Sequence, residues 1–188
     1  MEIVFATGNP HKLEELKEIT KGCGINFILP EGNFNPVENG STFEENSYIK
    51  AKEANRVSGK ISLADDSGLC VEALDGAPGL YSARYAGTQQ EKINKILQEL
   101  EPYTNRKAKF VCVMTLLDAD GTILNVSKGE CHGEIATKQS GTNGFGYDPV
   151  FIVDGFGKTM ADLSEETKNK VSHRANAMTD MLSFIKTL

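Results

Sequence analysis

Two adjacent carboxylates follow an apolar, strand-like run about a third of the way along the chain. The stretch "ISLADDSG" places Asp65 and Asp66 at the end of that run and Ser67 directly after them. Carboxylates at the C-terminal end of a strand are well placed to hold Mg²⁺, a hard cation that prefers oxygen ligands. Asp-Asp-Ser-Gly is also ordinary turn chemistry that needs no function. Adjacent residues of an extended chain point opposite ways, so at most one of the two aspartates faces a given ligand.

A second group of charges lies in "STFEENSYIKAKEA", which reads as a helix. Glu45 and Lys52 fall on one face of that helix, about 10 Å apart along its axis at the usual rise per residue. An acid followed by bases on one face suits a metal-bound polyphosphate. The alternative is a capping box, which fits either Thr42 with Glu45 or Ser41 with Glu44.

A short turn near the start of the chain, "FATGNPHK", joins a predicted strand to a predicted helix. Gly and Asn tolerate positive φ, and Pro is favoured in the first turn of a helix, so the sequence is compatible with a purely structural turn. Such a turn also presents backbone N–H groups beside a helix N-terminus, which attracts phosphate. On these residues alone both interpretations stay open.

Two further segments combine aromatic and polar residues. In "GTNGFGYDPVF", Phe145 offers a flat face to a base and Asp148 an acceptor at its edge; the alternative is a glycine-rich loop that enters a sheet. In "SHRANAM", His173 and Arg174 stand at a predicted helix start, where solvated or capping roles are equally open. Lys168 precedes them and is compatible with a plain surface lysine.

These residues must be positioned by a mixed set of strands and helices. Strands are predicted at 2–6, 25–30, 61–66, 108–118 and 147–153, and helices at 11–20, from about 42, at 91–100 and from about 164. The segment "TILNVSKGECHGEI" follows a "DADG" turn and predicts a hairpin return. Because at least one hairpin is present, a mixed α/β sheet is favoured over a purely parallel one.

The composition limits the class of protein. The chain has 188 residues, 39% hydrophobic and 24% charged, which fits a globular protein with a sizeable core. A net charge of −6 argues against nucleic-acid binding, which needs a basic surface. No apolar run is long enough for a membrane helix, and no signal peptide is recognisable. Four scattered cysteines without a C-x-x-C pair suggest reduced thiols in a cytoplasmic protein.

Taken together, five stretches resemble the inosine triphosphate pyrophosphatase family, also called XTP/dITP diphosphatases. They are "FATGNPHKLEEL", "STFEENSYIKA", "LADDSGLCVEALDGAPGLYSARYAG", "GFGYDPVF" and "LSEETKNKVSHRANAM", and they span residues 5–178. The resemblance implies one domain over residues 1–188: an elongated mixed α/β sheet flanked by helices, in two lobes with a substrate cleft between them. It also implies a homodimer.

The resemblance also implies a role for individual residues. The acids Glu45 and Asp66 match metal-binding positions, and Asp66 matches the proton acceptor. The substrate-binding set that it implies comprises Thr7, Gly8, Asn9, Pro10, His11, Lys12, Lys52, Ser67, Phe145, Gly146, Tyr147, Asp148, Lys168, His173 and Arg174. Ser47 and Asn143 depart from the family's common residues, and neither is a ligand.

The activity implied is Mg²⁺-dependent hydrolysis of ITP, dITP and XTP to the monophosphate and pyrophosphate. The rival interpretation is a nucleotide sensor that binds the same ligands without hydrolysing them. Retention of Glu45 and Asp66 favours the enzyme, because a pure binder needs no water-activating acid. The sequence leaves Arg84, in "GLYSARYAG", open between a phosphate contact, a brace and a dimer contact.

Overall fold

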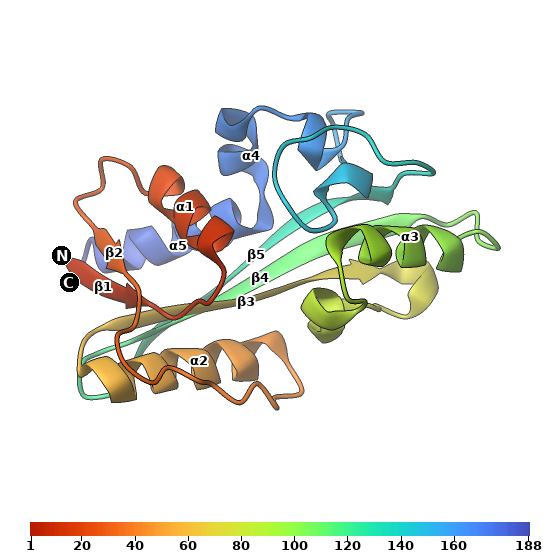
Figure 1. Cartoon of the computed structure of the whole chain (residues 1–188). Coiled ribbons are helices and arrows are strands. Elements are labelled where there is room, and N and C mark those ends of the chain that lie inside the picture. Colours follow the sequence, from red (N-terminus) through yellow and green to blue (C-terminus); the bar gives the residue numbers. More distant parts are fainter. The chain divides into compact units, whose positions relative to one another are not determined.

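The computed structural model describes residues 1–188 and contains one six-stranded sheet with helices (Figure 1). The strands are β1 (Glu2–Phe5), β2 (Asn26–Ile28), β3 (Ser62–Val71), β4 (Lys107–Leu117), β5 (Ile123–Ile135) and β6 (Phe151–Val153), in the order β2-β1-β3-β4-β5-β6. β1 pairs in parallel with β2 and β3, and β5 pairs antiparallel with β6. The predicted mixed α/β sheet is therefore confirmed.

Five α-helices and several short 3₁₀ turns connect the strands. The helices are α1 (Pro10–Ile19), α2 (Phe43–Ser58), α3 (Gln89–Glu99), α4 (Glu165–Val171) and α5 (His173–Ile185). The 3₁₀ turns are η1 (Glu72–Leu74), η2 (Gly79–Arg84), η3 (Asp148–Val150) and η4 (Met160–Asp162). No helix is both long and apolar enough to cross a membrane.

The predicted elements agree with the structure except in three places. β3 runs from Ser62 through Val71, so the two aspartates lie inside a strand rather than at its end. The strand predicted at 147–153 is a 3₁₀ turn followed by the short strand β6. The helical C-terminal region is broken at Ser172, which ends α4 just before α5 begins.

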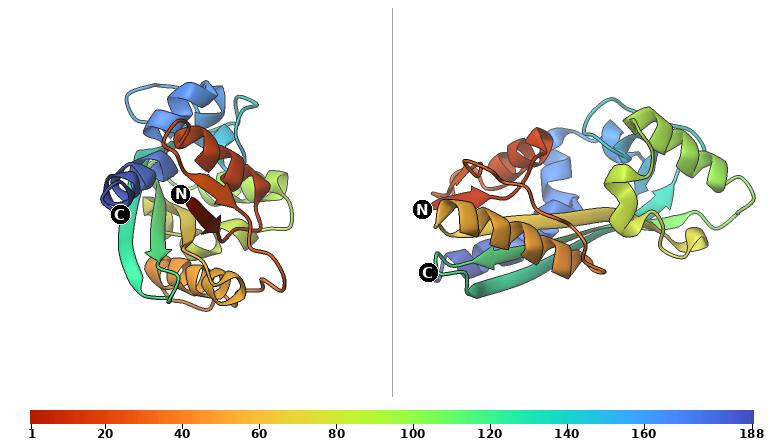
Figure 2. Two further views of the ribbon diagram at one scale, coloured as in Figure 1. Left: turned by 90° about the vertical axis from the view of Figure 1, so that its left-hand side faces the viewer. Right: turned by 60° about the horizontal axis from the view of Figure 1, so that its bottom comes forward.

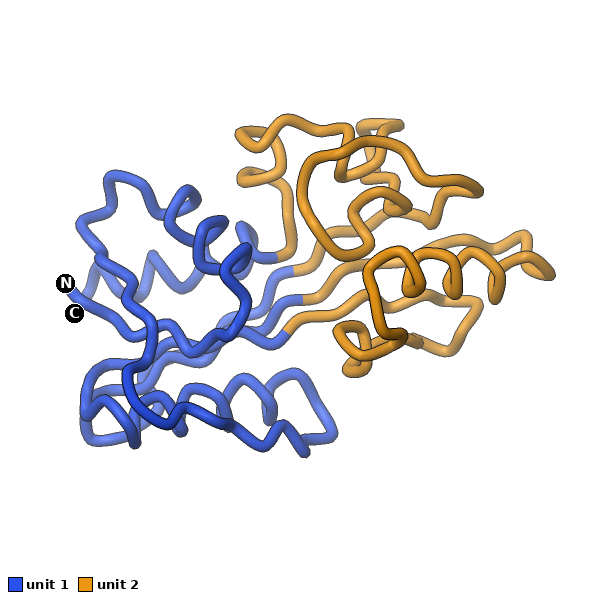
Figure 3. Tube along the Cα trace, viewed as in Figure 1, with its two compact units in different colours: residues 1–66, 112–129, 174–188 blue, residues 67–111, 130–173 orange.

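The chain divides into two compact units (Figure 3), each assembled from separate stretches of the sequence. Unit 1 comprises residues 1–66, 112–129 and 174–188, and unit 2 comprises residues 67–111 and 130–173. β3, β4 and β5 each contribute residues to both units. The two lobes expected from the sequence correspond to these units, whereas the single domain and the cleft stay predictions.

Unit 1 has helices on both faces of its strands, seen from two directions in Figure 2. One apolar cluster joins β1, β3 and β4 residues such as Phe5 and Leu63 to Leu16 of α1 and Met178 of α5. A second cluster joins the alternate strand residues, among them Ala64, to α2. Because strand side chains alternate, residue 65 falls on the side of α1 and α5 and residue 66 on the side of α2.

Unit 2 has its own core around β3, β4, β5 and β6. Buried members include Leu69 and Val71 from β3, Ile93 and Ile96 from α3, and Phe151 from β6. Phe151 packs against Phe110 with ring centroids 4.5 Å apart. This core supports the glycine-rich segment before β6.

Candidate active site

The turn between β1 and α1 is built by side chains that bond to their own backbone. Thr7 Oγ1 accepts the N–H of Asn9 at 3.0 Å, and Asn9 Oδ1 accepts the N–H of His11 at 3.0 Å. Asn9 is the N-cap of α1 and Pro10 its first residue, as the turn chemistry predicts. Gly8 has open space where a Cβ would point, so it leaves room for close approach of a ligand.

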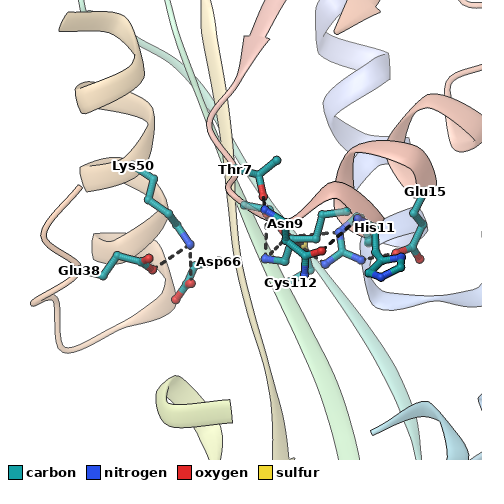
Figure 4. Close-up of polar contacts among 11 residues, drawn as sticks. Thr7, Asn9, His11, Glu15, Glu38, Lys50, Asp66 and Cys112 are labelled. Carbon is teal, nitrogen blue, oxygen red and sulfur yellow. Dashed lines mark hydrogen bonds and ion pairs between the residues drawn. The ribbon is translucent and has the colours of Figure 1, made fainter. Parts of the chain in front are cut away.

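Asp65 stands at the centre of a buried ionic cluster on the α1 side of β3. Figure 4 labels Glu15 and Cys112 of this cluster. Lys12 Nζ lies 3.0 Å from both carboxylate oxygens, and Arg174 donates from Nη2 at 3.0 Å and from Nε at 3.2 Å. Arg174 also forms an ion pair with Glu15 of α1. The thiol of Cys112 contacts the same carboxylate at 3.9 Å. The cluster ties α1, β3, β4 and α5 together.

The pKa values within this cluster reflect its charges. Burial alone would raise the pKa of Asp65, but the cations of Lys12, Arg174 and Lys50 outweigh it and hold that pKa well below its usual range. Burial and the neighbouring Asp65 carboxylate raise the pKa of the Cys112 thiol, so the thiol stays protonated and unreactive. Asp65 is thus a structural anion that is charged at neutral pH.

Asp66 points the other way, toward α2, into a second cluster. Lys50 Nζ lies 2.8 Å from Asp66 Oδ1 and 2.9 Å from Glu38 Oε2 (Figure 4). Burial raises the pKa of Asp66, partly offset by Lys50. Burial opposes the charge on Lys50, yet the surrounding carboxylates of Asp65, Asp66 and Glu38 raise its pKa. Asp66 therefore combines a carboxylate paired with Lys50 and a raised proton affinity.

Glu45 and Lys52 belong to neither the Asp65 cluster nor the Asp66 cluster. Thr42 Oγ1 accepts the N–H of Glu45 at 3.1 Å, so Thr42 is confirmed as the N-cap of α2. The Glu45 carboxylate accepts the backbone N–H and the hydroxyl of Ser41 at 2.6 and 2.8 Å. Lys52 is exposed, with its Nζ 5.5 Å from the ring centroid of Tyr48. The role of either residue toward a ligand stays a prediction.

Sequence reasoning missed Glu38 and Lys50. The buried face of α2 is marked by small residues, since Ser47, Ala51 and Ala54 are buried together with Lys50. A lysine at helical spacing from those small residues was the available signal. Glu38 lies in the irregular segment before α2, and no local pattern distinguishes it there.

The aromatic segment of unit 2 forms a separate group. Lys168 Nζ lies 2.8 Å from Asp148 Oδ2 and 4.8 Å from the centre of the Phe145 ring. Asp148 Oδ2 also accepts the N–H of Phe145 at 3.0 Å. Gly144 has a φ of +73°, and a Cβ there would lie 2.0 Å from Asp148 Oδ2, so only glycine fits. Asp148 thus fixes the loop backbone through Phe145, and the ammonium of Lys168 neutralises the charge of the Asp148 carboxylate.

The structure places the remaining candidates as follows. Gly146 donates its N–H to Gln89 Oε1 at 3.1 Å, and the Tyr147 hydroxyl donates to the carbonyl of Ser82 at 2.9 Å.

His173 is buried and stacks on Phe110, with ring centroids 4.8 Å apart. Ser67 is partly exposed within β3. Within unit 1, Arg174 is only 1% exposed and bound in the Asp65 cluster.

No group of three or more His, Cys, Asp or Glu side chains is arranged to hold a metal ion among the residues described. That finding does not conflict with Mg²⁺, which is commonly bound through one or two carboxylates plus substrate phosphates. Asp66 and Glu38 supply oxygen donors of the right type, both within 3 Å of the same ammonium nitrogen. The residues present therefore fit Mg²⁺ held with a phosphorylated substrate.

Fold and site together define a class: an α/β protein with a phosphate-type turn after β1 and two adjacent carboxylates on β3, the parallel neighbour of β1. The family model described as Ham1 family matches residues 3–184, and the chain belongs to this family.

Several relatives and solved structures are similar along nearly the whole chain. A protein of Prochlorococcus marinus (strain NATL1A) named "dITP/XTP pyrophosphatase" is 44% identical over 99% of this chain and 94% of its own length. A protein of Treponema denticola with the same name is 44% identical over 99% of each chain. The structure of a HAM1 protein from Coxiella burnetii matches with a TM-score of 0.90 at 40% identity, covering 100% of both chains. The Staphylococcus aureus Ham1 protein matches with a TM-score of 0.87 at 43% identity, covering 100% of this chain and 99% of that one.

Proposed function

We propose that this protein is a dITP/XTP pyrophosphatase that converts deaminated purine nucleoside triphosphates to the monophosphate and pyrophosphate with Mg²⁺. The similarity to relatives of that name supports the substrate class. The observation that carries the chemistry is the ionic arrangement on β3. Asp65 holds the lysine of the phosphate-type turn, and the next residue, Asp66, presents a carboxylate of raised pKa toward Lys50 and Glu38.

The phosphate end of the substrate is assigned to unit 1. The β1–α1 turn lies where β1 ends beside its parallel neighbour β3, the edge at which ligands bind in open α/β sheets. Backbone N–H groups at the start of α1 and the ammonium of Lys12 favour an anion there. Lys50 adds a second cation, which neutralises charge on the leaving pyrophosphate. Lys52 is the weaker candidate for that role because it is exposed on another face of α2.

Bound Mg²⁺ would supply positive charge to offset that of the phosphates and would lower the pKa of a water molecule. Asp66 and Glu38 are the residues that would hold it, in preference to Glu45, because these two carboxylates lie together around Lys50 whereas that of Glu45 bonds to Ser41 at the start of α2. Asp66 also accepts the proton of the attacking water, for which a raised carboxyl pKa is an advantage. Lys50 keeps Asp66 and Glu38 together and restrains the direction of the Asp66 carboxylate.

The purine end is assigned to the segment from Phe145 to Asp148. Phe145 offers a ring for stacking, and the buried Asp148–Lys168 pair fixes the backbone that supports it.

A homodimer and a cytoplasmic location are proposed on the family resemblance. Light scattering of the purified protein tests the homodimer.

Incubation with dITP and Mg²⁺ tests the function. We expect dIMP and pyrophosphate as the first products, resolved by ³¹P NMR, with loss of turnover in EDTA. Initial formation of dIDP and orthophosphate would contradict the proposed bond cleavage. Tight dITP binding without any product would support the rival interpretation, a nucleotide sensor.

A further inference from the structure

The segment "GLYSARYAG" has no role in the function proposed above, yet it contains a buried serine at a crossing of three chain segments. Ser82 lies on η2 (Gly79–Arg84) and is 7% exposed. Its hydroxyl donates to the carbonyl of Gly79 at 2.6 Å and accepts the N–H of Leu69 at 2.9 Å. A buried serine that both donates and accepts holds two segments at a fixed distance.

The segment on which Ser82 lies touches β3 closely. A Cβ on Gly68 would lie 2.2 Å from the carbonyl oxygen of Gly79 and 2.9 Å from Ser82 Oγ, so only glycine permits this approach. Cys70 and Pro78 form an isolated antiparallel bridge, and Val71 donates its N–H to Ala77. The contact begins two residues after Asp66 in the sequence.

The backbone of Ser82 makes the third connection. Its carbonyl accepts the hydroxyl of Tyr147 at 2.9 Å, and Tyr147 is only 4% exposed, with its ring in the core of unit 2. Tyr147 sits between Gly146 and Asp148, inside the segment assigned to the purine. Burial, with the nearby Tyr85 and Glu99, raises the pKa of Tyr147, so its hydroxyl remains a donor at any physiological pH.

We propose that Ser82 and Tyr147 are positioning residues that fix the purine-recognition segment to β3, and that base selectivity depends on this link. The inference rests on the proposed function. Tyr147 acts here through its hydroxyl as an anchor, while Phe145 is left to meet the base. If the anchor is lost, the loop samples more conformations and loses selectivity for the deaminated base, because discrimination requires polar groups held in place.

The test compares three variants in the full-length protein. Tyr147→Phe removes the bond to Ser82, and Ser82→Ala removes the bonds to Leu69 and Gly79. Tyr85→Phe is the matched control, because it also removes a tyrosine hydroxyl of unit 2, which is bonded to Glu99 instead. We expect the ratio of kcat/KM for dITP over dATP to fall about tenfold in the first two variants and less than twofold in the control.

Amide hydrogen exchange gives a readout that does not need activity. We expect faster exchange at Phe145 and Gly146 in Tyr147→Phe, with the amides of α5 unchanged. An unchanged dITP/dATP ratio together with unchanged exchange would overturn the inference. If Ser82→Ala does not fold, Tyr147→Phe decides alone. Absence of pyrophosphate release by the unmodified protein would instead overturn the proposed function, while the exchange measurement still tests the anchor.

Discussion

Asp65 and Asp66 are adjacent in the chain, yet their carboxylates face opposite sides of β3 and have pKa values displaced in opposite directions. Asp65 is bound by Lys12 and Arg174, which keep its pKa low despite burial. Asp66 faces Lys50 alone among the cations within hydrogen-bonding distance that the structure describes, and burial raises its pKa. One strand thus supplies a fixed anion and a titratable one.

Asp66→Asn should abolish most turnover while the protein stays folded. The amide keeps the shape but loses the negative charge needed for proton acceptance and for a metal ligand. We expect kcat to fall by at least about 100-fold, measured as pyrophosphate release from dITP. Circular dichroism and thermal unfolding serve as the control for folding. Turnover within a few-fold of the parent would exclude this role for Asp66.

Glu38→Gln and Glu45→Gln should differ in their Mg²⁺ requirement. Glu38 lies with Asp66 around Lys50, whereas Glu45 binds Ser41 at the start of α2. We expect Glu38→Gln to raise the Mg²⁺ concentration for half-maximal activity about tenfold or more, consistent with loss of one ligand. Glu45→Gln should leave it within about twofold. The reverse ranking would restore Glu45 as the metal ligand and remove Glu38.

The decrease in the free energy of unfolding at acid pH should depend on Asp65. Its pKa is lower in the folded protein than in the unfolded chain, so its contribution is fully present above the unfolded pKa of about 4 and is lost as pH falls. The contribution of Asp66 has the opposite sign. Because its pKa is raised in the folded protein, that contribution to the free energy of unfolding increases as the pH falls. Urea unfolding between about pH 5 and pH 2 should show a smaller loss of stability in Asp65→Asn than in the parent.

Glu2→Gln is the matched control for that measurement. Glu2 also has a lowered pKa, caused by Lys60, but the pair is exposed and screened by solvent. Its removal should leave the pH dependence close to that of the parent. An equal change in both variants would mean that the buried cluster is not what sets acid sensitivity.

The sequence predicted the fold well because the local signals agree with the tertiary packing. Strand alternation around Asp65 and Asp66 correctly predicted that the two side chains diverge. The sequence did not show which face of α2 is buried. It directed attention to Glu45 and Lys52 on the solvated side, while Lys50 lies on the packed side. Glu38 and Ser82 owe their positions to long-range contacts that no local pattern encodes.

Arg174→Ala separates base recognition from structural support. The resemblance places Arg174 in the substrate-binding set, and its guanidinium is a candidate donor to the oxygen of a deaminated base. If it has that role, its loss should reduce kcat/KM for dITP much more than for dATP. The structure favours support: Arg174 is buried with Glu15 and Asp65, and its removal leaves two buried carboxylates short of a cation. Breaking such a pair costs about 3–5 kcal/mol. We therefore expect a large drop in the free energy of unfolding and proportional losses on both substrates. Arg174→Lys, which retains the charge, should recover part of the stability. A stable Arg174→Ala protein whose dITP preference alone collapses would show that Arg174 reads the base.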